Sequence, residues 1–548
     1  MNVRHVLTIA ASVAIIAAFW YRGERFLAHN GPTFDEAVHL TAGYSYWTTG
    51  RFHLNHEDPP LMKLLWAWPL VIHDRSLHLS TVMAETPGNH WSVSTALVYQ
   101  SDLSPQQLLN PARRVNLAVG CVGILLVGWW AYRLWNSCQA GVVAAAFAAF
   151  DPNWLALACV LSTDTGLAVF TLLSCYLLWE YAAKPSHLVL WGIGVSVGLA
   201  LATKFSAVAV VCAVVAAALV HQAWGGRLAL PNSPAATPAR VAFVEFTFRV
   251  SLIAGVTLAC TYGIIHFDDW GRGLKFQLTR SEHGDGRMYL LGELSSQGWY
   301  HYFVVLLPLK LPLGLLVAWV AVFATRAVGR GSRLVFVVVP PLVFFVLASY
   351  ARVNLGLRVV LPVLPFLYLL AAGLATIDTC RWPARVLLGL CVAWCALSAW
   401  RHDPYPLSYF NELAGGPRGG MRIAADSNLD WGQGLPALRD YLQAQRIDMV
   451  YLSYFGTDRP ESYGIRFQAL PTYGRVGPPG GETIPESAAR HILVVSVNNL
   501  LGVYLSDPTT YAWLRGREPT AIVADCLYVY DLAGDIAAIA HVRQLTLK

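Results

Sequence analysis

Charged side chains are scarce in this chain. Only 13% of its 548 residues are Asp, Glu, Lys or Arg, whereas 55% are hydrophobic and the mean hydropathy is +0.46. A soluble protein carries about 25% charged residues. The deficit, together with repeated apolar runs of about 20 residues, excludes an ordinary soluble domain and predicts a polytopic membrane protein.

Paired cysteines and internal repeats are absent as well. None of the ten Cys belongs to a CxxC pair, so the sequence indicates neither a zinc site nor a disulfide framework. No segment recurs with a period of about 20–50 residues, which argues against a solenoid. The net charge of +6 does not indicate nucleic acid, because much of the Arg lies in short loops where it sets membrane topology.

The apolar runs predict about eleven transmembrane helices within residues 1–400. The first run, from His5 to Trp20, lacks a small-x-small cleavage site, so we interpret it as a retained anchor. Between it and the second run lies a long loop, residues 23–110, which we expect to carry interface helices. The candidate spans lie near residues 5–22, 112–132, 139–156, 158–181, 187–203, 205–222, 244–266, 300–324, 333–350, 357–376 and 385–400.

Basic residues in the short loops predict the orientation. Inner loops of membrane proteins are enriched in Lys and Arg, and an N-terminus inside places nearly every short basic loop on one side. An odd number of spans then puts the C-terminal part outside the cytoplasm. The predicted inner loops carry Arg133, Lys184, Arg227, Arg240, Arg326, Arg330, Arg333, Arg381 and Arg385.

After Trp400 the composition changes, and no later run could cross a bilayer. Short apolar runs alternate with helix-like stretches, which predicts a soluble α/β domain over residues 401–548 outside the cytoplasm. The predicted strands are Met449–Tyr454, Ile492–Val497 and Cys526–Leu532, and the predicted helices are Leu435–Gln443, Leu500–Leu505 and Thr510–Arg515. Polar residues follow predicted strands, where they could line a ligand cleft or equally cap helices: Asp426, Tyr454 and Asn498.

Two stretches of the loop 23–110 are amphipathic. Residues 35–48 are rich in Tyr and Trp. In the second stretch, Asp58 could cap a helix that has Pro59 at its first position. The pattern is typical of a helix that lies in the plane of the membrane interface. Lys63 belongs to the same stretch and lies beside its apolar face. The shared apolar face comprises Leu61, Leu64, Leu65 and Trp68.

The adjacent acids Asp35 and Glu36 are the main candidates for catalysis. One interpretation is a helix N-cap and first-turn acid; the other is a general base on the outer surface, with His39 on the same helical face as Asp35. Asp164 lies in the first turns of an apolar span, where a carboxylate costs roughly 2.5 kcal/mol or more. It either faces a polar cavity or pairs with backbone near the helix end.

Three cations could meet a phosphate on the predicted outer side, namely Lys63, Lys204 and Arg358. Long basic side chains also snorkel at helix ends without a further role. Glu57 adds an acid in the same outer loop. The stretch Asp426–Asp430 resembles the start of a calcium loop, but Trp431 replaces the required Gly, so we reject calcium there.

Several motifs follow one another along the chain: Asp35-Glu36, Pro59-Pro60-Leu61 with Lys63, Asp151 and Asp164, Tyr289–Glu293, Asn354-x-Gly356-x-Arg358, Tyr409–Leu413 and Asp426–Gln433. In this order they resemble the GT-C glycosyltransferases, and most closely the bacterial protein O-mannosyltransferase-like family (glycosyltransferase family 39). The resemblance covers nearly the whole chain.

This resemblance implies a multi-span enzyme in the inner or plasma membrane of a bacterium, which uses a polyprenyl-phosphate-linked sugar on the non-cytoplasmic side. The family's acidic pair matches Asp35 and Glu36, with the first as the expected base, and its second acidic position matches Asp164. The family usually reads His-Pro-Pro where this chain has Asp58-Pro59-Pro60, so no role of that His transfers. The β-trefoil domain of the eukaryotic members has no counterpart, so their protein acceptor does not transfer either.

The sequence thus predicts an inverting glycosyltransferase that moves mannose or another hexose to an acceptor hydroxyl on a protein, lipid or glycan. Asp35 and Glu36 are its predicted catalytic residues. Two alternatives remain, a transporter or flippase of lipid-linked substrates and a membrane-anchored envelope assembly protein. The need for a divalent metal or another cofactor stays open. The residues predicted to bind donor or acceptor are Asp164, Lys63, Arg358, Lys204, Glu57 and His39.

Overall fold

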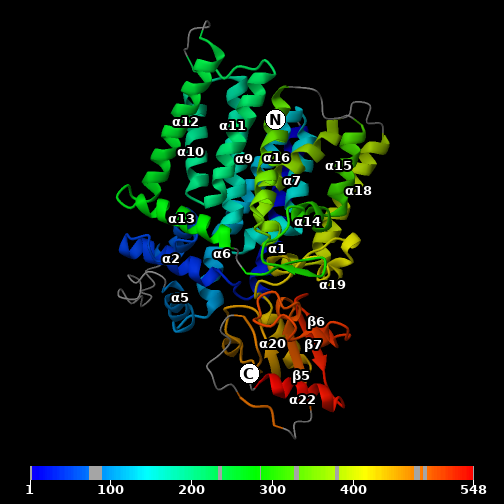
Figure 1. The fold of residues 1–548 in the computed structure, drawn as a ribbon. Helices are drawn as coiled ribbons and strands as arrows, with labels where there is room; N and C mark the ends of the chain where they lie inside the picture. The colour runs from blue at the N-terminus through cyan, green and yellow to red at the C-terminus, as the bar shows by residue number, and fades with distance from the viewer. Residues whose placement is uncertain are drawn as a thin grey trace.

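The computed structural model describes residues 3–72, 89–231, 237–283, 286–325, 332–376, 382–473, 482–485 and 490–546. These residues form a long helical part and a smaller C-terminal part that packs against one end of it (Figure 1). Among the predicted inner-loop residues, Arg326, Arg330 and Arg381 lie outside the described ranges.

The helical part contains most of the predicted membrane spans. Among the described residues, seven helices are long and apolar enough to cross a membrane, or up to nine if each of two bent pairs is one span. Its elements are α1 (Val3–His29), α6 (Pro105–Trp135), α7 (Cys138–Ala149), α8 (Pro152–Cys159), α9 (Thr163–Ala183), α10 (His187–Leu201), α11 (Val208–Ala223), α12 (Ala239–Thr261), α14 (Tyr302–Lys310), α15 (Leu313–Ala324), α16 (Val335–Ala351), η3 (Leu357–Val363), α17 (Leu364–Ala371), η4 (Ala372–Thr376) and α18 (Trp382–Arg401).

The predicted spans, about eleven in number, differ in length and continuity. Two predicted spans are bent pairs, α7 with α8 at 62° and α14 with α15 at 107°. Pro152 and Pro312 stand at these breaks, and proline cannot donate the backbone hydrogen bond that would continue a helix. Two others, α10 and α16, are apolar helices of only 15 and 17 residues.

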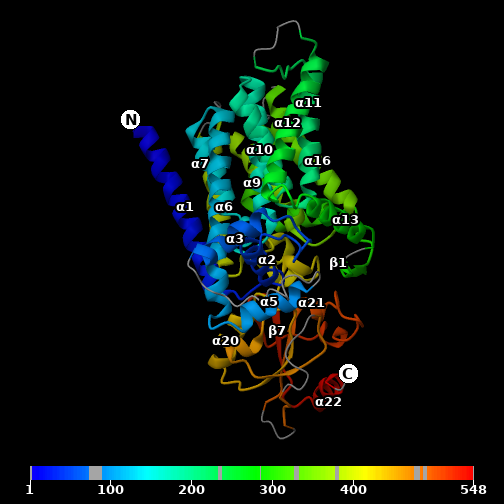
Figure 2. The same ribbon diagram turned by 90° about the vertical axis from the view of Figure 1, so that its left-hand side faces the viewer.

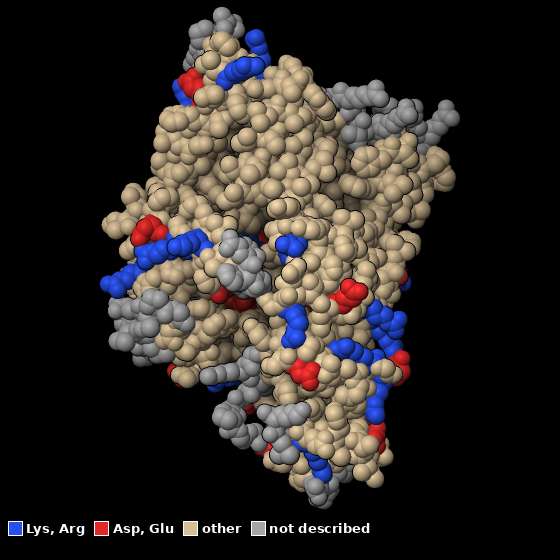
Figure 3. Space-filling model, in the orientation of Figure 1, with Lys and Arg blue, Asp and Glu red and all other residues tan. Residues whose placement is uncertain are grey.

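The surface of the helical part fits a membrane. Charged side chains are sparse over a broad belt of it and gather at its far end and around the C-terminal part (Figure 3). Figure 2 shows α1 at the edge of the helical part. Only 17% of the most apolar 18-residue stretch of this helix is buried inside the structure. Such exposure is expected for a helix that faces lipid on most sides.

Short helices cover the end of the helical part that meets the C-terminal part (Figure 1). They are α2 (Glu36–Thr49), α3 (Leu61–Ile72), α5 (His90–Tyr99) and α13 (Asp268–His283). The predicted cap at Asp58 is wrong, because α3 begins at Leu61, after both prolines. Leu65 and Trp68 of α3 are exposed, whereas its opposite face is buried, as an interface helix requires.

The C-terminal part is a mixed α/β domain. Its five-stranded sheet has the order β4-β3-β5-β7-β6, with parallel pairing among the first three strands and antiparallel pairing among the last three. The strands are β3 (Val450–Ser453), β4 (Phe467–Ala469), β5 (Ile492–Ser496), β6 (Ala521–Val523) and β7 (Leu527–Asp531), and the helices include α19 (Gly416–Gly420), α20 (Leu435–Ala444), α21 (Val497–Leu500) and α22 (Ile536–Leu545). A separate hairpin, β1 (Met288–Leu290) with β2 (Glu293–Ser295), lies between α13 and α14.

The three predicted strands of this domain correspond to β3, β5 and β7, and the predicted helix Leu435–Gln443 corresponds to α20. The other two helix predictions are wrong. Leu500 is the last residue of α21, and residues 501–505 form turns and bends; the 510–515 stretch contains only a short 3-10 turn, Ala512–Leu514.

Candidate functional site

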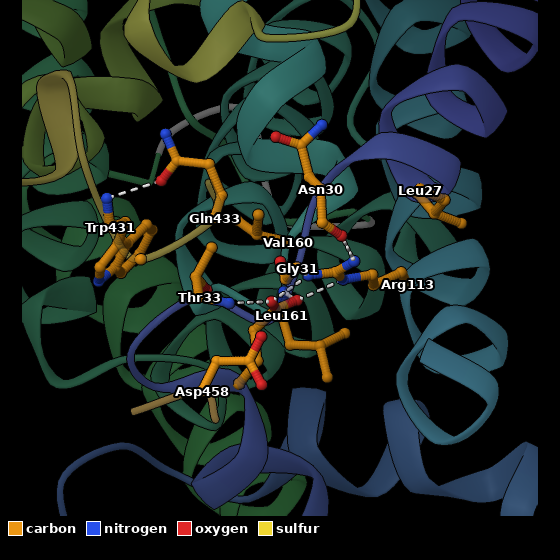
Figure 4. A network of polar contacts seen from close by, with 12 residues as sticks. Leu27, Asn30, Gly31, Thr33, Arg113, Val160, Leu161, Trp431, Gln433 and Asp458 are labelled. Carbon is orange, nitrogen blue, oxygen red and sulfur yellow. Dashed lines mark hydrogen bonds and ion pairs between the residues drawn. The ribbon is translucent and has the colours of Figure 1, made fainter. Parts of the chain in front are cut away.

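Asp35 and Glu36 are neighbours in sequence but lie in different environments. Glu36 is fully buried, and its carboxylate accepts hydrogen bonds from Arg113 Nε at 2.8 Å and Nη2 at 2.5 Å. The backbone N–H groups of Thr33 and Leu161 donate to the same carboxylate at 2.7 and 2.9 Å. Figure 4 shows Arg113, Thr33 and Leu161 converging on one point. Both Glu36 oxygens are thus engaged in holding the loop, which favours a structural role over catalysis.

Arg113 fastens the turn that precedes α2. Its guanidinium also donates to the carbonyl oxygens of Asn30 and Gly31, at 3.1 and 2.7 Å. The sequence reasoning missed Arg113, although an Arg at the outer start of an apolar run, with a buried acid elsewhere in the chain, is a signal for such a pair.

Asp35 occupies the N-cap position of α2 but makes no side-chain cap. Its carboxylate instead lies 3.9 Å from Arg358 Nη1, and 29% of its side chain is exposed. The helix-cap interpretation is therefore not supported by the geometry. An exposed carboxylate with a loosely placed cation is accessible to an incoming hydroxyl group.

Asp164 lies at the start of α9 and is buried. It forms an ion pair of 2.5 Å with Lys204 Nζ and accepts a short hydrogen bond from the Ser162 hydroxyl group. The Lys204 side chain is 22% exposed. The two acids belong to one site, because Arg358 interacts electrostatically with both Asp164 and Asp35.

Arg358 is held by the C-terminal domain. Its guanidinium lies over the Trp431 ring at 4.3 Å from the centroid. In the turn before it, the Leu355 carbonyl accepts from the Ser427 hydroxyl at 2.6 Å, and the Leu357 N–H donates to Asn428 Oδ1 at 3.1 Å. Gly356 has φ of 98°, a left-handed conformation that favours glycine.

The segment Asp426–Gln433 therefore carries Trp431, Ser427 and Asn428 to the site. Polar groups at the ends of two strands hold it: the Asp426 N–H donates to Asn498 Oδ1 at 2.7 Å, and Tyr454 donates to the Gly432 carbonyl at 2.5 Å. Tyr454 and Asn498 follow β3 and β5, as predicted. Asp426 instead opens a 3-10 turn, η7 (Asp426–Asn428), so the prediction that it follows a strand is wrong.

The ammonium group of Lys63 is held by protein oxygens. It donates to the Asn55 carbonyl and side-chain oxygens at 3.1 and 2.6 Å and to the Asp58 carbonyl at 2.7 Å. Burial lowers the pKa of Lys63 to about 8, against the opposing charges of Asp58 and Glu57. Because all three ammonium hydrogens are directed at protein oxygens, the geometry argues against phosphate contact by Lys63.

The remaining candidates are His39 and Glu57. His39 is 6% exposed, and its Nδ1 atom has no hydrogen-bond partner. Burial, and then the charges of Lys63 and Arg358, hold the pKa of His39 well below its usual value, so it is neutral. Glu57 lies 3.9 Å from His90 Nε2.

Asp58 occupies the position where the related family has His. Burial raises its pKa, and the charge of Asp164 adds to the rise, whereas Lys204 and Lys63 oppose it. The charged groups that act on Asp58 therefore include both members of the Asp164–Lys204 pair. The described residues contain no group of three or more His, Cys, Asp or Glu that could hold a metal ion.

An apolar groove of about 690 Å³ adjoins the short helices. The groove is lined by residues of α2, α3 and α12, which include Trp47, Leu61, Leu65, Trp68 and Cys260. Leu65 and Trp68, which line the groove, belong to the exposed face of α3.

The fold is that of a polytopic α-helical membrane protein with a C-terminal α/β domain. Residues 12–269 match the family profile of dolichyl-phosphate-mannose-protein mannosyltransferases. This stretch is just under half of the chain and contains Asp35, Glu36, Asp164 and Lys204. The resemblance to GT-C, mannosyltransferase-like proteins is confirmed. No curated protein matches the sequence.

Solved structures align with this chain at low similarity. ArnT from Cupriavidus metallidurans bound to undecaprenyl phosphate is 13% identical, with 96% of this chain and 98% of that chain covered and a TM-score of 0.46. The Pmt1-Pmt2 complex of S. cerevisiae bound to the sugar donor is 14% identical, with coverages of 50% and 34% and a TM-score of 0.32. At these TM-scores, the structural similarities do not assign a function to this chain.

Proposed function

We propose that this protein transfers a sugar, mannose or another hexose, from a polyprenyl-phosphate donor to an acceptor hydroxyl group on the outer face of the membrane. The observation that supports it most is the site of Asp35. A half-buried carboxylate lies beside Arg358, which also interacts electrostatically with Asp164, the partner of Lys204, at the end of the helical part that meets the C-terminal domain. The convergence of these groups favours an enzyme over a transporter or an assembly protein.

The proposed reaction is a single displacement at the anomeric carbon. The acceptor oxygen forms a bond to this carbon and its proton moves to Asp35, while the bond from the carbon to the phosphate oxygen breaks. The electron pair leaves with the polyprenyl phosphate. One displacement inverts the configuration at the sugar carbon.

Arg358 and Lys204 would stabilise the departing phosphate. Charge on the phosphate grows as the bond breaks, so fixed cations bind the transition state more strongly than the ground state. Arg358 is already held in place by Trp431 and by the turn that Ser427 and Asn428 support. Such preorganisation costs no rearrangement during the reaction.

The apolar groove at α3 and α12 would receive the isoprenoid chain of the donor. Burial of a long hydrocarbon contributes affinity at roughly 25 cal/mol per Å². The polar groups then need only place the phosphate.

A direct assay of the full-length protein in nanodiscs tests this function. Mannosyl-phospho-polyprenol is supplied as the donor, and the release of free polyprenyl phosphate and the anomeric configuration of the sugar product are measured. The proposal expects donor-dependent release with inversion. Release only from a sugar nucleotide, or retention of configuration, would contradict it.

A further inference from the structure

Aromatic rings gather beside Asp35 and are not used by the proposed reaction. Phe34, Phe455, Tyr473 and Tyr504, which we call the aromatic cluster, stack with nearly parallel planes. The ring centroids of Phe34 and Phe455 lie 5.3 Å apart at 22°, those of Phe455 and Tyr504 5.3 Å apart at 11°, and those of Tyr473 and Tyr504 5.1 Å apart at 30°. Trp91 meets Phe34 edge-on at 5.4 Å.

The aromatic cluster joins the outer loop to the C-terminal domain at the candidate site. Phe34 directly precedes Asp35, and its N–H donates to the Trp431 carbonyl at 2.8 Å. The Tyr504 hydroxyl donates to Asp426 Oδ2 at 2.8 Å. Asp426 and Tyr504 also interact electrostatically with Arg358. The cluster thus borders the same group of charges as Asp35, from the side of the C-terminal domain.

Part of this cluster is open to solvent. Phe455 is 3% exposed, but Tyr473 is 45% exposed and Trp91 is 37% exposed. A cluster that served only to pack the domain against the loop would be expected to bury its large rings. Tyr473 instead presents aromatic surface at the edge of the site.

We infer that the aromatic cluster is the acceptor subsite and that it binds the ring of a carbohydrate acceptor. This inference rests on the proposed function. A pyranose ring has an apolar face of C–H groups and a rim of hydroxyl groups, and the faces of aromatic rings carry the negative part of a quadrupole that attracts C–H hydrogens. The Tyr504–Asp426 pair supplies hydrogen-bonding groups for the rim.

The geometry of an inverting displacement separates this subsite from the donor. The attacking oxygen approaches the face of the sugar opposite to the leaving group. The apolar groove of α3 and α12 would place the leaving phosphate at the membrane side, so the acceptor arrives from the side of the C-terminal domain. The aromatic cluster lies on that side and adjoins the proposed base.

Saturation-transfer NMR on the full-length protein in nanodiscs, without donor, tests the subsite. Mannobiose and cellobiose are separate probes, and a short Ser/Thr peptide without aromatic residues is a third. Tyr473→Ala should reduce the saturation of the disaccharide ring protons about fivefold. Tyr473→Phe, which keeps the ring, should restore it. Tyr350→Ala, at an exposed tyrosine that stacks on Tyr300 elsewhere, should leave it unchanged.

The outcomes separate this inference from the proposed function. Disaccharide saturation that is absent, or equal in the wild type and Tyr473→Ala, overturns the carbohydrate subsite even if the donor is cleaved. Saturation of the peptide alone also overturns it and would indicate a protein acceptor. Saturation that depends on Tyr473 in a protein that never cleaves the donor would support the subsite and contradict only the proposed reaction. Asp35→Asn should bind the disaccharide and lose donor turnover.

Discussion

At the scale of single residues, the adjacent acids Asp35 and Glu36 have different roles. Glu36 holds the loop through Arg113, whereas Asp35 keeps a partly exposed carboxylate beside Arg358. The two sequence positions look equivalent, because neither composition nor spacing reveals which carboxylate meets a buried cation. Only the path of α6 brings Arg113 to Glu36.

Glu36→Gln should destabilise the protein strongly. It leaves the guanidinium of Arg113 buried without its counter-charge, and breaking a buried pair costs about 3–5 kcal/mol. Thermal unfolding in detergent should show a clearly lower midpoint. Glu24→Gln is the matched control, because its pair with Arg114 is largely exposed and such pairs contribute little. An unchanged midpoint for Glu36→Gln would contradict the structural role.

Kinetic measurements on variants should distinguish the roles of the three cations. Lys204→Met and Arg358→Gln should each lower kcat/KM for the donor by about 10²-fold, since each removes a charge that stabilises the leaving phosphate. Lys63→Met should reduce the yield of folded protein but leave donor kinetics unchanged, because its ammonium group binds Asn55 and Asp58. Lys275→Met, at an exposed lysine of α13, controls for charge. A kinetic defect in Lys63→Met alone would mean that Lys63, and not Lys204 or Arg358, stabilises the leaving phosphate.

At the scale of elements, the sequence was informative about regular segments and less so about breaks. The apolar runs predicted the positions of all the membrane helices, and alternation predicted β3, β5 and β7. The 107° bend between α14 and α15 and the 3-10 segment η3 were not predicted, because prolines inside an apolar run do not reveal how far the chain turns. The contact of Asp426–Gln433 with Arg358 joins residues far apart in sequence and depends on the packing of two domains.

The contact between α5 and the C-terminal domain should depend on pH. Tyr99 and Tyr463 donate to the Asp458 carboxyl at 2.9 and 2.7 Å, and burial raises the pKa of Asp458 from 3.8 to about 7. Between about pH 4 and pH 7 the folded protein retains a proton that the unfolded chain releases, so stability falls as the pH rises through this window.

Asp458→Asn removes this titration. Its unfolding midpoint should vary less between pH 5 and pH 8 than that of the wild type. Some variation should remain, because burial also raises the pKa of Asp430 to about 7. Identical pH profiles for wild type and Asp458→Asn would show that the contact does not titrate in this range.

At the scale of the whole molecule, the C-terminal domain completes the site that the membrane helices begin. Trp431, Ser427 and Asn428 position Arg358, and the Phe34–Phe455 stack joins the outer loop to the domain. The base and the domain must therefore lie on the same side of the membrane. The basic short loops predict that this side faces away from the cytoplasm.

Fusion reporters test this orientation. Alkaline phosphatase, which needs an oxidising compartment, should be active when fused after Lys548. A fluorescent protein that matures only in the cytoplasm should be dark at the same position. A bright fluorescent fusion with an inactive phosphatase fusion would overturn the topology and with it the outer location of Asp35.

The central claim is that Asp35 accepts the proton of the acceptor. The most direct measurement compares sugar transfer from mannosyl-phospho-polyprenol by purified Asp35→Asn and Asp440→Asn, where Asp440 is an exposed carboxylate on α20. Asn keeps the size of Asp35 and removes the proton acceptor, so turnover should fall by at least about 10²-fold, with an unchanged unfolding midpoint. Asp440→Asn should match the wild type. Near-normal turnover by folded Asp35→Asn would contradict the account.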